Sequence, residues 1–339
     1  MMSIKAYAKT QGIAVTSVNG LVAGHGSVQE TWLAMQSAAA LSGTPRLVGF
    51  SCIDTFPEVL WLAQRARQAW DGVRIVIGNA MATLNYERIL RQHDCFDYVV
   101  VGDGEVAFTK LALALANDAA VDDVPGLARR SEQGQILRTP SSLVDLDELP
   151  RPARDELPTV LADGFAASVF STRGCPYRCT FCGTGAMSAM LGKGSYRAKS
   201  VDAVVDEIDY LVSDYDVNFL SITDDLFISK HPGSQQRAAD FANAVLRRGI
   251  SVNFMVDIRL DSVVDLDLFK HGPTSNCAPT ASRSSLVDKM PPTRSTPCNS
   301  SALTLSRAPL CFTPPCSPTS YAKQSACCGQ QSIRSASSS

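Results

Sequence analysis

Short apolar, β-branched runs alternate through the first half of the chain with longer segments in which apolar residues recur every three or four positions. The short runs predict strands and the longer segments predict amphipathic helices. The predicted strands cover residues 12–18, 46–52, 73–78 and 97–102, and the predicted helices cover residues 27–42, 56–70, 85–93 and 105–117. This alternation predicts an α/β fold over residues 1–147, a doubly wound parallel sheet that binds ligands at the carboxyl ends of its strands.

A segment rich in proline and charge, within residues 148–164, separates this unit from a second one and is typical of a linker. Residues 165–270 then resume the alternation. The predicted strands are 165–172, 217–225 and 251–259, the predicted helices are 200–215 and 234–248, and another helix begins at 263–270. This order predicts the first half of a β/α barrel, in which the residues that end the strands gather at one mouth.

The composition changes abruptly at about residue 271. Residues 271–339 hold 16 serines, nine prolines and six of the 11 cysteines, without sustained helical or strand periodicity. Such a segment buries too little apolar surface to offset the entropy of the chain, so we expect it to be disordered. We interpret the change as a truncation or a shift of reading frame after about residue 270, which would remove the remaining strands of the barrel.

Charge and hydropathy restrict the possible functions. The 339 residues carry a net charge of −2, and residues 1–270 carry −7 (25 basic and 32 acidic residues), so we expect no nucleic-acid partner. No stretch is long and apolar enough to cross a membrane, and we expect a cytoplasmic protein. Cys52 and Cys95 lie in or beside apolar runs, where cysteine is most simply a small core residue.

Three cysteines follow the pattern C-x3-C-x2-C in the segment RGCPYRCTFCGTG. These thiols, Cys175, Cys179 and Cys182, suit a soft metal, and three of them can hold three corners of a cubane iron–sulfur cluster while one iron stays open to a ligand. A zinc site would need a fourth cysteine or histidine nearby, and neither His231 nor His271 has that spacing. A redox dithiol formed by the last two cysteines would leave the first unexplained.

This segment resembles the signature of radical S-adenosylmethionine (SAM) enzymes, and the similarity extends through NFLSITDDLF and FMVDIRLD to about residue 270. The resemblance implies that Cys175, Cys179 and Cys182 bind a 4Fe-4S cluster. It also implies a set of SAM-binding residues: Phe181 beside the adenine, Gly183 and Gly185 in the loop, Thr223, Asp224 and Asp225 near the amino group, and Arg259 near the carboxylate. Two alternatives remain open: a turn or helix cap for the two aspartates, and an ion pair of Arg259 with Asp257 or Asp261.

The first half of the chain is similar to the cobalamin-binding domain that is fused to many radical SAM proteins, through VGFSCIDTF, VRIVIGNAMAT and DYVVVGDGEVAF. The resemblance implies a cofactor site at Gly78, Asn79, Gly102, Gly104 and Glu105, although glycines there also suit tight strand-to-helix turns. The D-x-H-x-x-G motif of many cobalamin proteins is not found. Cobalamin would then bind without a protein histidine, or the domain would be a vestige.

The resemblance implies a radical SAM enzyme that cleaves SAM to a 5'-deoxyadenosyl radical and carries out methylation or cyclisation, with a flavodoxin or ferredoxin as electron donor. The substrate would be a small molecule or a peptide. The alternatives are a catalytically inactive relative that retains only cobalamin or cluster binding, and a structural zinc or iron–sulfur protein.

Overall fold

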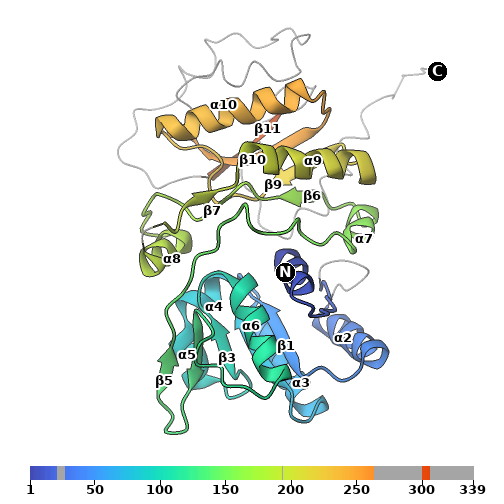
Figure 1. The fold of residues 1–339 in the computed structure, drawn as a ribbon, viewed down its shortest axis with the longest axis vertical. Coiled ribbons are helices and arrows are strands. Elements are labelled where there is room, and N and C mark those ends of the chain that lie inside the picture. Colours follow the sequence, from blue (N-terminus) through green and yellow to red (C-terminus); the bar gives the residue numbers. More distant parts are fainter. Residues whose placement is uncertain (21–26, 193, 263–299, 306–339) are drawn as a thin grey trace, which may run out of the picture.

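The computed structural model describes residues 1–20, 27–192, 194–262 and 300–305. It contains two α/β units joined by an extended connecting segment, residues 139–156 (Figure 1). The first unit has a five-stranded sheet in the order β1-β2-β3-β4-β5. Its strands are β1 (Leu47–Ser51), β2 (Arg74–Gly78), β3 (Tyr98–Val100), β4 (Leu127–Arg130) and β5 (Ile136–Arg138). Its helices are α1 (Met2–Thr10), α2 (Val28–Ser42), α3 (Phe56–Ala69), α4 (Ala80–Leu84), α5 (Tyr86–Gln92) and α6 (Gly104–Ala116).

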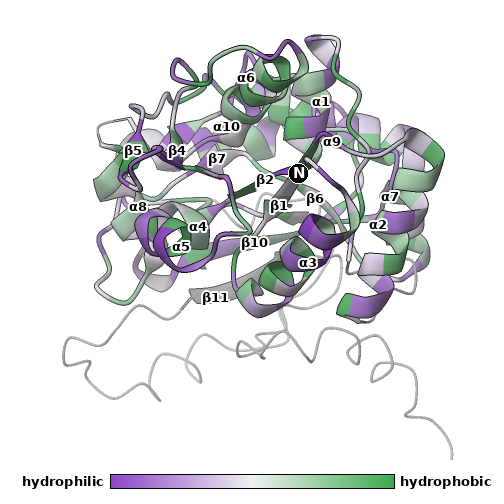
Figure 2. Ribbon diagram, turned by 90° about the horizontal axis from the view of Figure 1, so that it is seen from below, coloured by the Kyte–Doolittle hydropathy of each residue, from purple (hydrophilic) through white to green (hydrophobic). Residues whose placement is uncertain are grey.

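Helices cover both faces of the first sheet, as the alternation predicts (Figure 2). Ile75 and Ile77 of β2 are fully buried on the face covered by α3 and α5, whereas Val76 between them packs toward α6. Side chains of one strand point alternately to the two faces, so a strand that is apolar at every position is buried on both. β1, β2 and β3 are parallel, and the antiparallel pair β4 and β5 completes the sheet.

The predicted strand at residues 12–18 is wrong. The chain begins with helix α1, which packs against α6, and residues 13–19 have no regular secondary structure. The run GIAVTSV has strand-like residues, but a strand also needs a partner, and within the described part of the chain β1 pairs only with β2. Local propensity therefore does not bring this segment into the sheet.

The second unit has a four-stranded sheet in the order β11-β10-β9-β6, in which β6, β9 and β10 are parallel. Its strands are β6 (Ala167–Val169), β9 (Phe219–Ile222), β10 (Asn253–Arg259) and β11 (Ser300–Leu305). A separate antiparallel pair joins β7 (Thr172–Arg173) to β8 (Arg197–Ala198). Its helices are α7 (Leu157–Ala162), α8 (Gly183–Leu191), α9 (Val201–Tyr215) and α10 (Pro232–Arg247), with a 3-10 turn at Leu260–Ser262. The three parallel strands and their helices form a partial β/α barrel.

Two amphipathic helices, α9 and α10, cover this second sheet (Figure 1). Ile208 and Leu211 of α9 are fully buried against Leu220 of β9. Phe241 of α10 makes an edge-to-face contact with Phe254 of β10, with 5.6 Å between the ring centroids. The apolar stripes of both helices are thus the core of the unit, and they hold the three parallel strands in register.

Strand β11 departs from the predicted disorder of residues 271–339. Residues 300–305 pair antiparallel with β10, so that Phe254 lies opposite Leu305 in the register. Without β11, β10 would be the edge of this sheet, and the unpaired backbone of an edge strand offers a template for such pairing. The rest of that segment and the helix predicted at 263–270 lie outside the described residues.

We expect Ile208→Ala to lower the free energy of unfolding by about 2–5 kcal/mol, because it removes a fully buried side chain from the contact between α9 and the sheet. Denaturant titration followed by circular dichroism measures this. Leu33→Ala is the matched control, since Leu33 on α2 is 60% exposed and should change stability by less than about 0.5 kcal/mol. Equal losses in the two variants would contradict the packing described here.

Candidate functional site

The three cysteines lie on the loop that joins β7 to α8, and all three are half-buried. Cys175 follows β7 after a single residue, and Cys182 is the residue that precedes the first turn of α8. The backbone N–H of Cys182 donates to the carbonyl of Cys179 at 3.1 Å, which turns the chain between these two cysteines. The loop is therefore fixed at one end by a strand and at the other by a helix.

Asp224, at the end of β9, holds the entry to this loop. Its Oδ1 accepts the backbone N–H groups of Ser171 at 2.6 Å and Thr172 at 2.8 Å, and its Oδ2 accepts the Ser171 hydroxyl. The side chain is buried, and burial raises the pKa of Asp224 despite these hydrogen bonds. The sequence predicts that Asp224 contacts SAM. In the structure its carboxylate accepts hydrogen bonds from the backbone of Ser171 and Thr172, directly before the cysteine loop.

Arg259 ends β10 and reaches the loop from a neighbouring strand. Its guanidinium lies 4.1 Å from the centroid of the Tyr177 ring and donates to Sγ of Cys179 at 3.5 Å. It also forms a bidentate ion pair with Asp261, with both hydrogen bonds at 2.9 Å. The ion pair named above as an alternative is therefore present, while the same guanidinium contacts the cysteine loop. A contact to the SAM carboxylate stays a prediction.

Asp225 and Asp257 bring negative charge to the same strand ends. The hydroxyl of Thr184, in the first turn of α8, donates to Oδ1 of Asp225 at 3.0 Å. The pKa of Asp257 is raised by partial burial and by the charges of Asp224 and Asp225. Negative charge of this kind favours a cation beside Asp257. Thr223 lies beside them, and its N–H donates to the carbonyl of Val169 at 2.8 Å.

The pKa of the Cys175 thiol is also raised. Burial is the main cause, and the negative charges of Asp225 and Cys182 add to it, against the opposing effects of a hydrogen bond with the Tyr177 backbone and the charge of Arg259. A raised pKa keeps the thiol protonated at neutral pH. Metal binding at this loop would therefore release a proton.

The donor set fits an iron–sulfur cluster: three thiols within eight residues, on one loop, beside the guanidinium of Arg259. In the part of the chain that the structure describes, no three His, Cys, Asp or Glu side chains are gathered closely enough to hold a metal ion.

Glycines shape this loop. A Cβ at Gly185 would lie 3.2 Å from the carbonyl oxygen of Tyr177, so the helix packs tightly on the loop backbone. A Cβ at Gly183 would lie 3.4 Å from Leu84 of α4. Gly174, which the sequence reasoning missed, has φ +78°, and a Cβ there would lie 2.5 Å from the carbonyl oxygen of Ser195. Phe181 is 60% exposed, so its ring is accessible to a ligand.

The predicted cobalamin-site residues lie at the carboxyl ends of β2 and β3. Asn79 has φ +81°, accepts the N–H of Ala80 at 2.7 Å and donates to Ser51 at 2.9 Å, which makes it the N-cap of α4. A Cβ at Gly78 would be 3.7 Å from Val100, whereas one at Gly102 would be 3.0 Å from Leu191 of α8. The end of this sheet thus faces the helix that follows the cysteines.

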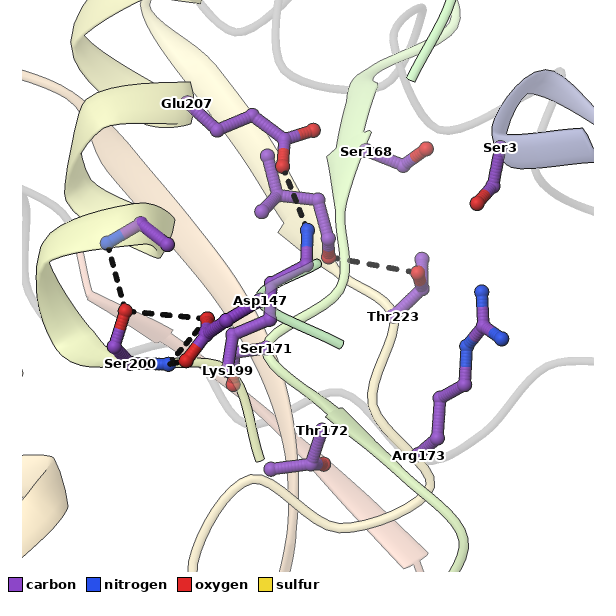
Figure 3. A network of polar contacts seen from close by, with 12 residues as sticks. Ser3, Asp147, Ser168, Ser171, Thr172, Arg173, Lys199, Ser200, Glu207 and Thr223 are labelled. Carbon is purple, nitrogen blue, oxygen red and sulfur yellow. Dashed lines mark hydrogen bonds and ion pairs between the residues drawn. The ribbon is translucent and has the colours of Figure 1, made fainter. Parts of the chain in front are cut away.

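Gly104 and Glu105 contact protein groups in this structure. A Cβ at Gly104 would lie 2.7 Å from Ile4 of α1. The buried carboxylate of Glu105 binds Arg173 of β7, with Oε1 to Nη2 at 2.5 Å, and accepts the hydroxyl of Ser3 at 2.6 Å. In Figure 3 the Arg173 guanidinium points toward Ser3. Glu105 is therefore a structural ion-pair partner here, and its contact with a cofactor stays a prediction.

A second polar network holds β8 against α9 (Figure 3). The ammonium of Lys199 is buried, donates to Glu207 at 3.0 Å and lies 3.9 Å from the centroid of the Phe170 ring. Glu207 also pairs with Arg154 of the connecting segment. Ser200, the N-cap of α9, donates its N–H to Asp147 at 2.9 Å. These contacts fasten the connecting segment to the second unit.

Comparisons with known proteins agree with this arrangement. The family model described as B12 binding domain matches residues 1–112. An uncharacterised methyltransferase of Pyrococcus horikoshii is 29% identical over 224 residues, which are 64% of this chain and 47% of the relative. The anaerobic magnesium-protoporphyrin IX monomethyl ester cyclase of Rubrivivax gelatinosus is 24% identical over 65% of this chain and 40% of the relative. The chain thus spans less than half the length of these relatives.

Among solved structures, the cobalamin-dependent SAM radical enzyme OxsB, with aqua-cobalamin and SAM bound, matches 80% of this chain and 38% of its own. The TM-score is 0.63 at 19% identity, which shows a shared fold. The fold and the cysteine loop resemble those of radical SAM enzymes. Residues 1–112 match a B12 binding domain, and the chain is similar to a methyltransferase, to a magnesium-protoporphyrin IX monomethyl ester cyclase and, in fold, to a cobalamin-dependent SAM radical enzyme. Within the described residues, no helix is long and apolar enough to span a membrane.

We expect Asp224→Ala to lower the free energy of unfolding by on the order of 3 kcal/mol, because two buried backbone N–H groups lose their acceptor. Asp224→Asn is the matched variant: its amide oxygen can accept both N–H groups, so it should cost clearly less. Thermal and denaturant unfolding of both variants measure the difference. An Asn variant as unstable as the Ala variant would argue against the backbone role.

The free energy of unfolding should also fall in acid, because protonation of Glu105 weakens its ion pair with Arg173. Burial alone would raise the pKa of Glu105, but hydrogen bonds and charge from Arg173, with the Ser3 hydroxyl, lower it below the ordinary 4.5. The stabilisation is therefore complete above pH 4.5 and is lost as the pH falls through the lower folded-state pKa. The stability difference between the native chain and Glu105→Gln should shrink below pH 4.5, as measured by unfolding at several pH values. A constant difference would contradict the pKa shift.

Proposed function

We propose that this chain is a cobalamin-dependent radical SAM enzyme of the methyltransferase or cyclase type. One observation carries the proposal: a loop with three thiols leaves β7 near the ends of the parallel strands. Arg259 contacts this loop, Asp224 binds the residues before it, and Asp225 binds the first turn of the helix after it. Cys175, Cys179 and Cys182 would hold a 4Fe-4S cluster with one iron open to SAM. When bound, the cluster supplies the electron that cleaves SAM to methionine and a 5'-deoxyadenosyl radical.

The side chains around the loop suit SAM by charge. SAM carries a sulfonium and an ammonium group, and Asp225 and Asp257 place negative charge at the strand ends that would receive them. Arg259 supplies the positive charge that a carboxylate requires, and part of its charge is already balanced by Asp261. Gly183 and Gly185 let the loop backbone approach a ligand closely, and Phe181 offers an exposed aromatic face.

Cobalamin binding is proposed for the first unit. The match of residues 1–112 to the B12 binding domain supports it, and Gly78, Asn79 and Gly102 lie at the strand ends where ligands of doubly wound sheets bind. When bound, cobalamin supplies a methyl group for transfer to carbon. The substrate is proposed to be a small molecule or a peptide, with a flavodoxin or ferredoxin as electron donor.

The alternative is a catalytically inactive relative that keeps only cobalamin or cluster binding. The abrupt change of composition at about residue 271 motivates it. The two possibilities differ in one measurable property, which is the cleavage of SAM by the reduced chain.

We expect the chain, reconstituted with iron and sulfide without oxygen, to bind about four irons and to form 5'-deoxyadenosine from SAM once reduced. Cys179→Ala should lose labile sulfide and SAM cleavage. Cys95→Ala is the matched control, because Cys95 is also half-buried but lies outside the loop and should keep both. Iron and sulfide analysis, electron paramagnetic resonance (EPR) with and without SAM, and chromatography of the nucleoside product measure these properties.

The outcomes separate the candidates. A cluster signal that does not respond to SAM, with no 5'-deoxyadenosine, would identify a binding relative without catalysis. Zinc without labile sulfide would identify a structural metal protein and would refute the proposal.

A further inference from the structure

Four charged side chains join the two units directly before the cysteine loop. Asp103 and Glu105 stand at the start of α6, whereas Arg173 of β7 and Arg197 of β8 are register partners in the small sheet. Glu105 binds Arg173 through both oxygens, at 2.5 and 3.1 Å. Asp103 binds Arg197 at 2.7 Å and Arg173 at 3.2 Å. We call these four residues the interdomain charge cluster.

The charge cluster is largely removed from water. The side chain of Glu105 is 3% exposed and that of Asp103 is 10% exposed, against 17% for Arg197 and 23% for Arg173. Two carboxylates and two guanidinium groups balance in charge. A buried charge that loses its partner is strongly unfavourable. The charge cluster therefore stabilises the one arrangement of the two units in which all four side chains are paired.

The connecting segment is tied to the same cluster. The N–H of Val144 donates to Asp103 at 3.0 Å, and its carbonyl accepts from Arg197 at 2.7 Å. The first unit, the second unit and the chain between them thus meet at one carboxylate. A displacement of either unit would break several of these contacts together.

The path from the cluster to the cysteines is short and stiff. One residue, Gly174, separates Arg173 from Cys175, and it has φ +78° with no room for a side chain beside Ser195. On its other side β7 is held through Thr172 by Asp224 of the second unit. β7 is therefore fixed between a carboxylate of each unit, and Cys175 must follow its position.

From this geometry we infer that Asp103 and Glu105 are positioning residues: they set where the cysteine loop lies relative to the B12-binding domain. The inference rests on the proposed function, in which the two units hold cofactors that act on one substrate. It gives the G-D-G-E segment at the start of α6 the role of an interdomain anchor that acts through Arg173 and Arg197.

Hydrogen–deuterium exchange of the full chain without cofactors tests the anchor itself. In Glu105→Gln, amides of residues 171–185 should exchange about tenfold faster or more, relative to amides of β2. Asp97→Asn is the matched control: Asp97 is a largely buried carboxylate that binds Arg67 and the N–H of Ile75, entirely within the first unit. It should leave residues 171–185 unchanged. Unchanged exchange in Glu105→Gln, or an equal increase in Asp97→Asn, would overturn the inference.

EPR of the reduced chain tests the positioning role. In the native chain, adding cobalamin should change the spectrum of the cluster. Glu105→Gln should lose this response to cobalamin and keep the response to SAM, whereas Asp97→Asn should keep both. A full cobalamin response in Glu105→Gln would overturn the positioning role. A native chain that forms no cluster would refute the proposed function, and the exchange experiment would still decide whether the anchor exists.

Discussion

The position of the cysteine loop depends on one buried carboxylate, that of Asp224. The chain leaves the main sheet after β6, and β7 pairs with β8 instead of with the parallel strands. Hydrogen bonds of the main sheet therefore do not place the loop. Asp224 does so by accepting two backbone N–H groups from the residues that enter β7. Burial raises the pKa of Asp224, because removing a charged carboxylate from water is unfavourable.

The two units are joined by polar and apolar contacts that meet around this loop. On the polar side, Arg173 and Arg197 reach the carboxylates of α6. On the apolar side, α8 packs against α4, and Leu191 of α8 lies beside Gly102, which follows β3. Arg173 lies two positions before Cys175, and α8 begins directly after Cys182, so the loop belongs to the interface as much as to the second unit.

Hydropathy patterns predict most of the fold because strands buried on both faces and amphipathic helices leave a local signature. They fail at residues 12–18, whose strand-like composition finds no partner, and they miss the antiparallel pair β4 and β5. The cysteine spacing predicts the loop for a chemical reason, since few sites need three thiols so close together. Patterns of this kind do not reveal partners far apart in the sequence.

Long-range pairing decides the roles of the acidic residues. Asp224 and Asp225 are neighbours in the sequence, yet one is buried against β7 and the other is exposed beside α8. Glu105 resembles a ligand-binding residue after a glycine, and its actual partner, Arg173, lies 68 positions away. Arg173, two positions before Cys175, is the sequence feature that could have indicated this ion pair.

Cys182 caps α8, and this has a thermodynamic consequence. The unpaired N–H groups of a helix's first turn carry partial positive charge, so a thiolate or an anionic cluster at that position stabilises the helix. The same helix packs against α4 of the other unit. If a cluster held at Cys182 strengthens the contact of α8 with α4, that contact raises the affinity for the cluster by the same factor, because the coupling of two binding equilibria is reciprocal.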